Sequence, residues 1–380
     1  MLSFQISKMP TIRILSATGA YAVDCGPGAL RRLGSPLARL RDVTGVFVLS
    51  SPAVWAHWGR SVTRALAKHK PVRVILFDDS EASKDLQTIE ALARQLIRMG
   101  ADRSAVIVAV GGGVVGDVAG FAAAAYLRGV RIVHVPTTLV AQVDSSIGGK
   151  TGVNLAEGKN LVGAFYSPKF VIADPEILLT LPHREFRSGL YEVIKYALIA
   201  DPELFAFLDR RMLALLRRDA AALSWVTARC IRIKAHVVAK DERESGLREI
   251  LNFGHTLGHA LEAATKYRRF RHGEAIAWGM IYATLLGVAT DRFKESDATR
   301  FIRLVASVGP LPGVSGIRAT QLRSILAGDK KARSGRVRWV LPRRIGKVDW
   351  GVELPWQLVS RTFAALPQFA GHARPGSVRR

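Results

Sequence analysis

The amino-acid sequence predicts an α/β domain followed by a mainly helical domain. Short apolar runs bounded by polar or glycine-rich segments recur through the first half, and they have the length of buried parallel strands. Beyond about Thr180 apolar residues recur at helical spacing instead, after a polar joint, LPHREF, that contains proline. We therefore expect two domains, residues 1–182 and 183–380, each of ordinary size for a chain of 380 residues.

The first domain should begin with strands and continue as strand–helix pairs. The runs TIRIL, YAVDC and GVFVLS predict strands, and residues 58–68 have a helical pattern. A buried strand over residues 72–77 precedes the loop DDSEASK and a predicted helix over residues 86–99. Asp79 or Ser80 could simply cap that helix. The loop also follows a parallel strand, and such loops border the ligand crevice of open α/β sheets.

The segment from residue 105 to 160 carries the strongest functional signal. A buried strand over residues 105–110 meets three glycines, and an alanine-rich helical segment starts near Asp117. In this order, backbone N–H groups and a positive helix end meet any phosphate bound there. GGGVVG satisfies the dinucleotide pattern G-x-G-x-x-G, but it lies outside the first strand–helix unit and lacks an acidic residue about twenty positions on. The ordinary Rossmann fingerprint is therefore disfavoured.

A second apolar strand, over residues 130–135, leads into segments that we expect to be loops. These are VDSSIGGKTGVN and GKNLVGAF, in which small residues and two lysines dominate. Small residues let a backbone approach a polyanion closely, and lysines neutralise it. Late in the second domain, ARSGRVRWVLP predicts a hairpin with a Ser-Gly turn.

The second domain carries residues that could bind a metal ion. Glu192 and Lys195 are three apart and share a helix face, and His255 and His259, four apart, do likewise. With His272, these residues suit a Zn²⁺ site that keeps one position open. Any one of the histidines alone is more often a satisfied polar residue. Spacing favours His255 and His259 as a ligand pair, and the absence of HExxH gives a metalloprotease no support.

The net charge of +24 is unevenly distributed, with +7 up to Pro182 and +17 beyond it. A basic cleft for anionic ligands is one interpretation, and a solvated basic surface, including the tail HARPGSVRR, is the commoner one. No basic stripe with interleaved aromatic residues is present, so we expect no nucleic-acid partner.

Several observations favour a cytoplasmic enzyme. The first ten residues lack the apolar core of a signal peptide, and two cysteines make no disulfide framework. The longest apolar stretch, residues 275–289, is too short to span a bilayer, so we expect a buried helix and no membrane partner.

Taken together, these motifs closely resemble those of the 3-dehydroquinate synthases. The likeness runs through GGGVVGDVAGF, DSSIGGKTGVN and GKNLVGAFY to SGLYEVIKYALI, LNFGHTLGHALEAA, HGEA and DKK, covering roughly residues 79 to 349. The resemblance implies a Rossmann-like NAD-binding domain followed by a helical metal- and substrate-binding domain. It also implies conversion of 3-deoxy-D-arabino-heptulosonate 7-phosphate into 3-dehydroquinate and phosphate, in the shikimate pathway of aromatic amino-acid biosynthesis. NAD would be used catalytically, with Zn²⁺ or Co²⁺ as the metal.

The resemblance also assigns residues to each ligand. The metal ligands would be Glu192, His255 and His272, which leaves His259 to the substrate, unlike the spacing argument. NAD would meet Asp79, Glu81, Lys84, Gly113, Val114, Val115, Gly116, Asp117, Thr137, Thr138, Lys150, Lys159, Ile177, Leu178, Leu179 and Thr180. The substrate would meet Asp144, Lys150, Asn160, Lys195, Lys234, Arg248, Asn252, His259 and one or both of Lys330 and Lys331. Arg128 would reach the neighbouring subunit's substrate, which implies a homodimer.

Two alternatives remain open at this point. Another sugar phosphate cyclase would share the NAD and metal motifs and differ among the residues for the substrate carboxylate, yet Arg248, Asn252 and DKK keep the dehydroquinate pattern. A metal-dependent polyol dehydrogenase would turn over NAD, but DSSIGGKTG and DKK argue against it. The departures from the family pattern are mild: Tyr191 stands where a small residue is common, and the chain is unusually basic.

Overall fold

The computed structural model describes residues 11–16, 19–69, 71–327 and 337–371, and these fall into two compact units. The described residues of Met1–Pro182 form the first unit together with Ala220–Ala239. Those of His183–Asp219 and Lys240–Arg380 form the second. A helix from the middle of the chain thus belongs with the N-terminal unit, although the sequence pattern groups it with the helices around it.

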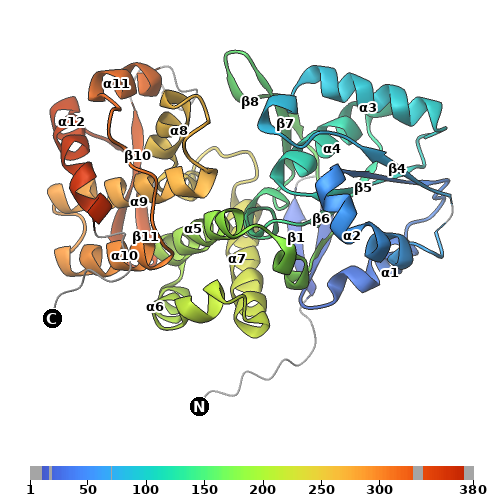
Figure 1. Ribbon diagram of the computed structural model, residues 1–380, viewed down its shortest axis with the longest axis horizontal. Helices are drawn as coiled ribbons and strands as arrows, with labels where there is room; N and C mark the ends of the chain where they lie inside the picture. Colours follow the sequence, from blue (N-terminus) through green and yellow to red (C-terminus); the bar gives the residue numbers. More distant parts are fainter. Residues whose placement is uncertain (1–10, 17–18, 70, 328–336, 372–380) are drawn as a thin grey trace. The chain divides into compact units, whose positions relative to one another are not determined.

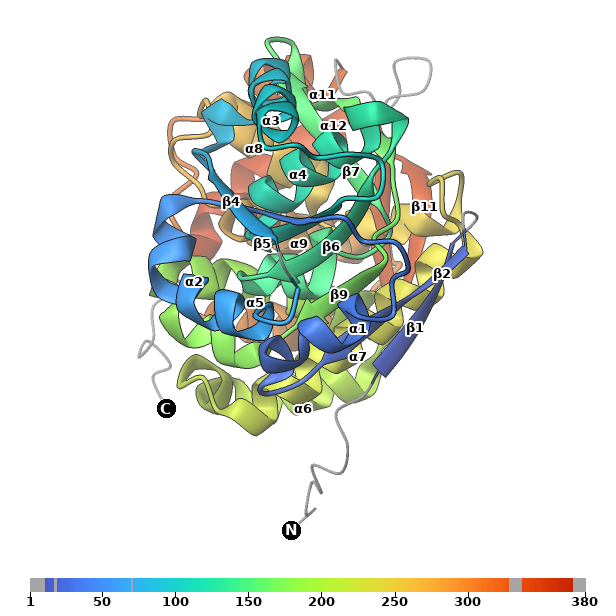
Figure 2. The same cartoon turned by 90° about the vertical axis from the view of Figure 1, so that its right-hand side faces the viewer.

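The first unit is built on a twisted, seven-stranded sheet of order β1-β2-β9-β6-β5-β3-β4 (Figures 1 and 2). β1 pairs antiparallel with β2, and the other neighbours are parallel, with Val108 of β5 opposite Val48 and Val133. The sheet strands are β1 Thr11–Ser16, β2 Gly19–Cys25, β3 Val46–Ser50, β4 Val72–Leu76, β5 Val106–Gly111, β6 Arg131–Pro136 and β9 Phe170–Ala173. The longer helices are α2 Pro52–Ala65, α3 Leu86–Arg98, α4 Gly113–Ala125 and α7 Ala220–Lys240.

Short helical turns complete this unit. They are η1 Ala29–Arg32, α1 Gly34–Leu37, η2 Glu81–Ser83, η3 Tyr126–Arg128, the π-helical turn η4 Ala141–Ser145, and η5 Pro175–Thr180. Because side chains alternate along a strand, Ile107 and Ala109 of β5 pack with α3 and α4 on one face of the sheet. Val106, Val108 and Val110 pack with η1, α1 and α2 on the other face. The strands are therefore apolar on both faces, as the continuous apolar runs predict.

Two helix starts differ from the sequence prediction. α2 begins at Pro52, six residues before the expected start, because Ser51 caps it with a 3.5 Å hydrogen bond from the Val54 amide and Pro52 suits its first turn. α3 begins at Leu86 as predicted, but its cap is Asp85, whose carboxylate accepts from the Thr88 amide at 2.8 Å. The expectation that Asp79 or Ser80 caps this helix is therefore wrong.

The segments expected to be loops after β6 instead form an antiparallel hairpin. β7 Lys150–Leu155 pairs with β8 Gly158–Phe165, and Gly152 lies opposite Gly163. A Cβ atom on Gly163 would lie 2.0 Å from the Thr151 carbonyl oxygen, so the two strands approach too closely for a side chain. The small residues of this segment therefore serve strand packing as well as any ligand.

The second unit is mainly helical. Its helices are α5 His183–Ala200, α6 Pro202–Leu216, η6 Leu247–Asn252, α8 His255–Ala264, α9 His272–Ala289, α10 Glu295–Ser307, α11 Ala319–Ala327, α12 Trp356–Ala365 and η7 Leu366–Gly371. α9 contains the apolar stretch 275–289 and is almost entirely buried, as predicted. Among the described residues, no helix combines the length and the apolar character needed to cross a bilayer.

A late hairpin is present in the second unit. β10 Arg338–Arg344 pairs antiparallel with β11 Lys347–Glu353, and the turn between them contains Gly346 with a φ of 86°. The alternating run RWVLP forms the first strand, as predicted. The Ser-Gly turn of the prediction lies outside the described residues.

A substitution at the contact between α8 and α9 tests how closely the second unit is packed. A Cβ atom on Gly279 would lie 1.8 Å from the Gly254 carbonyl oxygen, so Gly279→Ala has to push two helices apart. We expect it to lower the free energy of unfolding by about 3 kcal/mol, at the upper end for overpacking. Urea denaturation measures the change. Gly313→Ala is the matched control, because its nearest neighbour would be Ser315 Oγ at 3.7 Å. Equal midpoints for the two variants would contradict this packing.

Candidate active site

The glycine turn of the first unit connects β5 directly to α4. α4 begins at Gly113 with Gly112 as its N-cap, four residues before the predicted start near Asp117. Gly111 has to be glycine, because a Cβ atom there would lie 2.4 Å from Val115 Cβ. Gly113, Val114 and Val115 therefore lie in the first turn of the helix, where backbone N–H groups lack partners within the helix. Gly116 and Asp117 follow, and the Gly116 amide already donates to the Gly112 carbonyl at 3.0 Å. This arrangement suits an anionic ligand.

Lys84 is the centre of the polar network beside this turn. It is only 4% exposed, and its Nζ lies 2.5 Å from both Asp117 Oδ2 and Asn160 Oδ1. Burial raises the pKa of Asp117, while the Lys84 charge lowers it and does not fully compensate. Three residues assigned to NAD or substrate by the resemblance, from η2, α4 and β8, are thus brought together.

Asn154 joins this network, although the sequence analysis did not single it out. Its Nδ2 donates to Glu81 Oε1 at 2.8 Å, its Oδ1 accepts from the Asn160 amide at 2.9 Å, and Lys159 Nζ lies 3.5 Å from Glu81 Oε1. Asparagine is common in loops and this segment is predicted to be a loop, so no local pattern singles the residue out.

Most of the other residues assigned to NAD lie after three strands of the same unit, β6, β9 and β4. Thr137 follows β6, and its amide donates to the Gly111 carbonyl at 2.9 Å, while Thr138 Oγ1 accepts from the Ala141 amide. Ile177, Leu178, Leu179 and Thr180 form most of η5, after β9, and Trp58 Nε1 donates to Thr180 Oγ1 at 2.9 Å. Asp79 lies in the loop after β4, next to Asp78, which accepts from Ser80 and Ser83.

Asp144 and Lys234 meet within the first unit. Lys234 comes from α7, is 5% exposed, and places Nζ 2.7 Å from the Asp144 carbonyl oxygen and 2.5 Å from its Oδ1. Lys150 opens β7 and is exposed. Arg128 is exposed too, in η3, where Leu127 and Arg128 both have left-handed φ values, 48° and 65°. Such backbone is costly for residues other than glycine.

The second unit contains a cluster of one carboxylate and two imidazoles, in which Glu192 and His255 are buried and the His272 side chain is 35% exposed. Glu192 of α5 is fully buried, and its Oε1 lies 3.1 Å from His272 Nε2 and 3.4 Å from His255 Nε2. Ligand atoms about 2.0–2.1 Å from a tetrahedral Zn²⁺ lie roughly 3.3 Å apart. All three ligand atoms lie within 4.8 Å of one another. The residues therefore fit a divalent ion by both spacing and chemistry.

Lys195 sets the charge balance of this cluster, with Nζ 2.6 Å from Glu192 Oε2. Burial raises the pKa of Glu192, but Lys195 and His255 lower it more, so that it lies well below its usual range. Burial and the Lys195 charge lower the pKa of His255. Burial also lowers the pKa of His272, but Glu192 and Glu262 outweigh it and raise it to about 10. A divalent ion at this cluster therefore competes with the proton on His272.

Of the residues assigned to substrate in this unit, His259 lies beside the cluster, while Arg248 and Asn252 lie in η6, which precedes α8. The His259 ring is 5.3 Å from His255 and 6.0 Å from His272, between ring centroids. Asn252 Nδ2 donates to Glu244 Oε1 at 2.7 Å. Arg248 is 2% exposed, and its amide donates to Asp241, whose pKa burial raises but three backbone hydrogen bonds lower to about 2. Lys330 and Lys331 lie outside the described residues.

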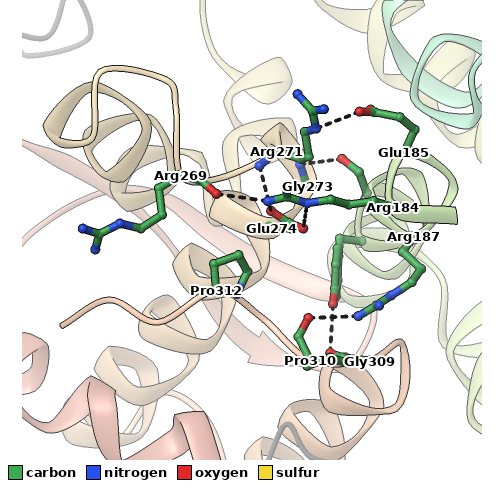
Figure 3. Close-up of polar contacts among 12 residues, drawn as sticks. Arg184, Glu185, Arg187, Arg269, Arg271, Gly273, Glu274, Gly309, Pro310 and Pro312 are labelled. Carbon is green, nitrogen blue, oxygen red and sulfur yellow. Dashed lines mark hydrogen bonds and ion pairs between the residues drawn. The ribbon is translucent and has the colours of Figure 1, made fainter. Parts of the chain in front are cut away.

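Arginine side chains hold the first turn of α9, which carries His272 (Figure 3). Glu274 accepts from Arg184 Nε and Nη2, both at 2.7 Å, and from the Arg271 amide at 2.8 Å. Arg184 also donates to the Arg269 carbonyl at 3.0 Å, and Arg271 Nε lies 2.8 Å from Glu185. This side of the helix start is thereby tied to α5, the helix that supplies Glu192.

A neighbouring contact involves Tyr191. It is fully buried, and its hydroxyl donates to the Gly309 carbonyl at 3.4 Å. Arg187 donates to the Pro310 carbonyl at 2.9 Å (Figure 3). Tyr191 therefore packs α5 against the loop after α10.

Solved structures with this fold define the class. The chain matches a 2-deoxy-scyllo-inosose synthase complexed with carbaglucose-6-phosphate, NAD⁺ and Co²⁺ at a TM-score of 0.85 and 29% identity, covering 94% of this chain and 100% of that one. It also matches 2-epi-5-epi-valiolone synthase from Streptomyces hygroscopicus subsp. jinggangensis, with NAD⁺ and Zn²⁺ bound. The TM-score is 0.82 and the sequence identity 27%, and the match covers 96% of this chain and 99% of that one. The fold is that of the sugar phosphate cyclases, as predicted.

The sequence comparisons then give the family. Residues 74–188 match the 3-dehydroquinate synthase N-terminal model, and residues 189–332 match the C-terminal one. The chain is 45% identical over 360 residues to 3-dehydroquinate synthase of Koribacter versatilis, covering 94% of this chain and 98% of that protein. It is 46% identical over 350 residues to 3-dehydroquinate synthase of Solibacter usitatus, covering 91% of this chain and 97% of that protein. The chain belongs to the 3-dehydroquinate synthase family, which confirms the resemblance.

The two candidate ligand sets differ in a measurable way. We expect His255→Ala and His272→Ala to lose most bound metal, because each removes an imidazole beside Glu192 Oε1. His259→Ala should keep its metal and lose mainly turnover. Metal analysis of the three purified variants measures this, with far-UV circular dichroism to check folding. A metal-free His259→Ala beside a metal-loaded His272→Ala would instead support the helical pair His255 and His259.

Proposed function

We propose that this protein is a 3-dehydroquinate synthase, which converts 3-deoxy-D-arabino-heptulosonate 7-phosphate into 3-dehydroquinate and phosphate. Membership of the family supports the reaction. The observation that carries it is the pair of sites on the described residues: a glycine turn opening α4 in the first unit, and the Glu192–His255–His272 cluster in the second. A dinucleotide suits the glycine turn, and a divalent ion suits the Glu192–His255–His272 cluster.

In the first unit, the residues of the glycine turn would bind and orient NAD. The N–H groups of the first turn of α4 suit its diphosphate, and Glu81 suits a ribose hydroxyl because Asn154 and Lys159 fix its carboxylate. Lys84 holds Asp117 and Asn160 in place. When bound, NAD⁺ takes a hydride from the substrate and later returns it.

In the second unit, Glu192, His255 and His272 would hold the metal. A bound divalent ion makes a substrate hydroxyl more acidic and so easier to oxidise. Lys195 is buried beside Glu192 and can bind the substrate as a cation. His259 lies beside both cluster histidines and can hold or pass a proton toward the leaving phosphate. Arg248 and Asn252 of this unit offer further charged and hydrogen-bonding groups for a phosphorylated acid. The first unit offers such groups in Lys234, Asp144 and Lys150.

Finer features of the proposal rest on the family resemblance. The metal is Zn²⁺ or Co²⁺, since imidazole and carboxylate ligands suit both. The protein works as a homodimer in the cytoplasm, with no nucleic-acid or membrane partner. The left-handed backbone at Leu127 and Arg128 supports the dimer, because strain of this kind is typical of functional positions and here presents an arginine on the surface.

The reaction is tested by following NAD. With the heptulosonate phosphate and a trace of NAD⁺, we expect phosphate release to exceed the NAD⁺ present many times over while no NADH accumulates, because the hydride returns to the product. A phosphate assay and absorbance at the NADH band measure both quantities in one cuvette. Protein stripped of NAD is the control and should be inactive. NADH formed in proportion to product would support a polyol dehydrogenase instead.

The shared site is tested by mixing inactive chains. Arg128→Ala and Lys195→Ala dimers should each be inactive, but after subunit exchange one site in each mixed dimer is intact. Random exchange then restores about a quarter of wild-type activity, as half of the dimers are mixed.

As the control, a mixture of Lys195→Ala chains with His255→Ala chains should stay inactive. Each change inactivates the site of the chain that carries it, so a mixed dimer has no intact site. Native mass spectrometry confirms the mixed dimers. No recovery in confirmed Arg128→Ala/Lys195→Ala dimers would place Arg128 in its own subunit's site.

A further inference from the structure

Both histidines of the Glu192–His255–His272 cluster turn the same ring nitrogen toward Glu192. His255 and His272 place Nε2 at 3.4 Å and 3.1 Å from Glu192 Oε1. Their opposite nitrogens meet different acceptors. His255 Nδ1 lies 3.2 Å from the Phe253 carbonyl oxygen, and His272 Nδ1 lies 3.5 Å from Glu262 Oε2. Each ring is therefore held on both sides, one by backbone and the other by a carboxylate.

The position and burial of Glu262 tie this residue to the cluster. It lies on α8 seven residues after His255, two helical turns on, so the two side chains share a face of that helix. The residue is only 4% exposed. Burying a carboxylate is unfavourable unless it is paired or hydrogen-bonded, and the His272 imidazole provides such a partner.

We propose that Glu262 is a positioning residue for the metal centre: it accepts the Nδ1 proton of His272 and so keeps Nε2 of that ring directed at the ion. The inference rests on the proposed metal site. A carboxylate that accepts the second N–H of a ligating histidine fixes its tautomer and ring orientation and makes it a better ligand. Glu262 then acts through His272 and makes no bond to the ion.

A second arrangement of the same residues has to be distinguished. His259, Glu262 and His272 also offer three ligand atoms within 4.8 Å, so Glu262 could itself be a ligand. The two arrangements use opposite nitrogens of the His272 ring. They also differ in what glutamine does at position 262, because an amide oxygen accepts a hydrogen bond well but is a poor ligand for Zn²⁺ or Co²⁺.

Titration of the metal-free protein with Co²⁺ tests the proposal, with visible absorbance reporting coordination and a competing chelator reporting affinity. We expect one Co²⁺ per wild-type chain. Glu262→Met keeps the volume and removes the acceptor, so it should bind Co²⁺ 10- to 100-fold more weakly, the usual effect of losing such a partner. Glu262→Gln should stay within a few-fold of wild type with an unchanged spectrum. Asp349→Asn, which removes a carboxylate paired with Arg292 and Arg343, is the control and should bind normally.

Four results would overturn the proposal. They are wild-type affinity in Glu262→Met, a loss in Glu262→Gln as large as in Glu262→Met, two ions per wild-type chain, and a Glu262→Gln spectrum of altered coordination. The last remains decisive if Glu262→Met fails to fold, which circular dichroism detects. A wild-type protein that binds no Co²⁺ at all would instead refute the proposed metal site. The two failures are therefore distinct.

Discussion

Burial of the Glu192 carboxylate is the constraint that determines how the helices of the second unit are arranged. A fully buried carboxylate is unfavourable unless charges and hydrogen bonds surround it. Lys195 supplies one such charge from the same helix, and His255 and His272 supply imidazoles from the first turns of α8 and α9. Three helices therefore have to converge on one carboxylate. Two packing features allow this convergence: the close contact between Gly279 and Gly254, and the hydrogen bonds from Arg184 to Glu274.

Much of this architecture could be predicted from the sequence because its signals are local. A buried parallel strand is a short apolar run, and the runs at β3, β4, β5 and β6 were identified within a residue or two at most ends. Residues at helical spacing, such as Glu192 with Lys195, share a face wherever the helix packs. Helix starts were less accurate, because Ser51 and Asp85 act as caps through side-chain hydrogen bonds that several nearby residues could equally make.

The rest depends on contacts that no local pattern encodes. Asn154 matters because the hairpin brings it to Glu81 and Asn160, and the hairpin itself was mistaken for loops because glycines dominate it. Glu262 resembles any polar residue on a helix until His272, ten positions on, faces it. The choice of His272 over His259 as a metal ligand likewise follows from family resemblance, since spacing alone favours His255 with His259. In the structure, His272 Nε2 lies 3.1 Å from Glu192 Oε1.

The position of α7 bears on how the chain folds as it is made. Ala228, Ile231 and Ala235 of this helix share a buried cluster with Ile14 and Val23 of β1 and β2, and Lys234 reaches Asp144. The first unit therefore cannot close until a segment more than thirty residues beyond Pro182 has left the ribosome, after α5 and α6 of the other unit. A fragment cut at Pro182 would leave this apolar face uncovered and prone to aggregation.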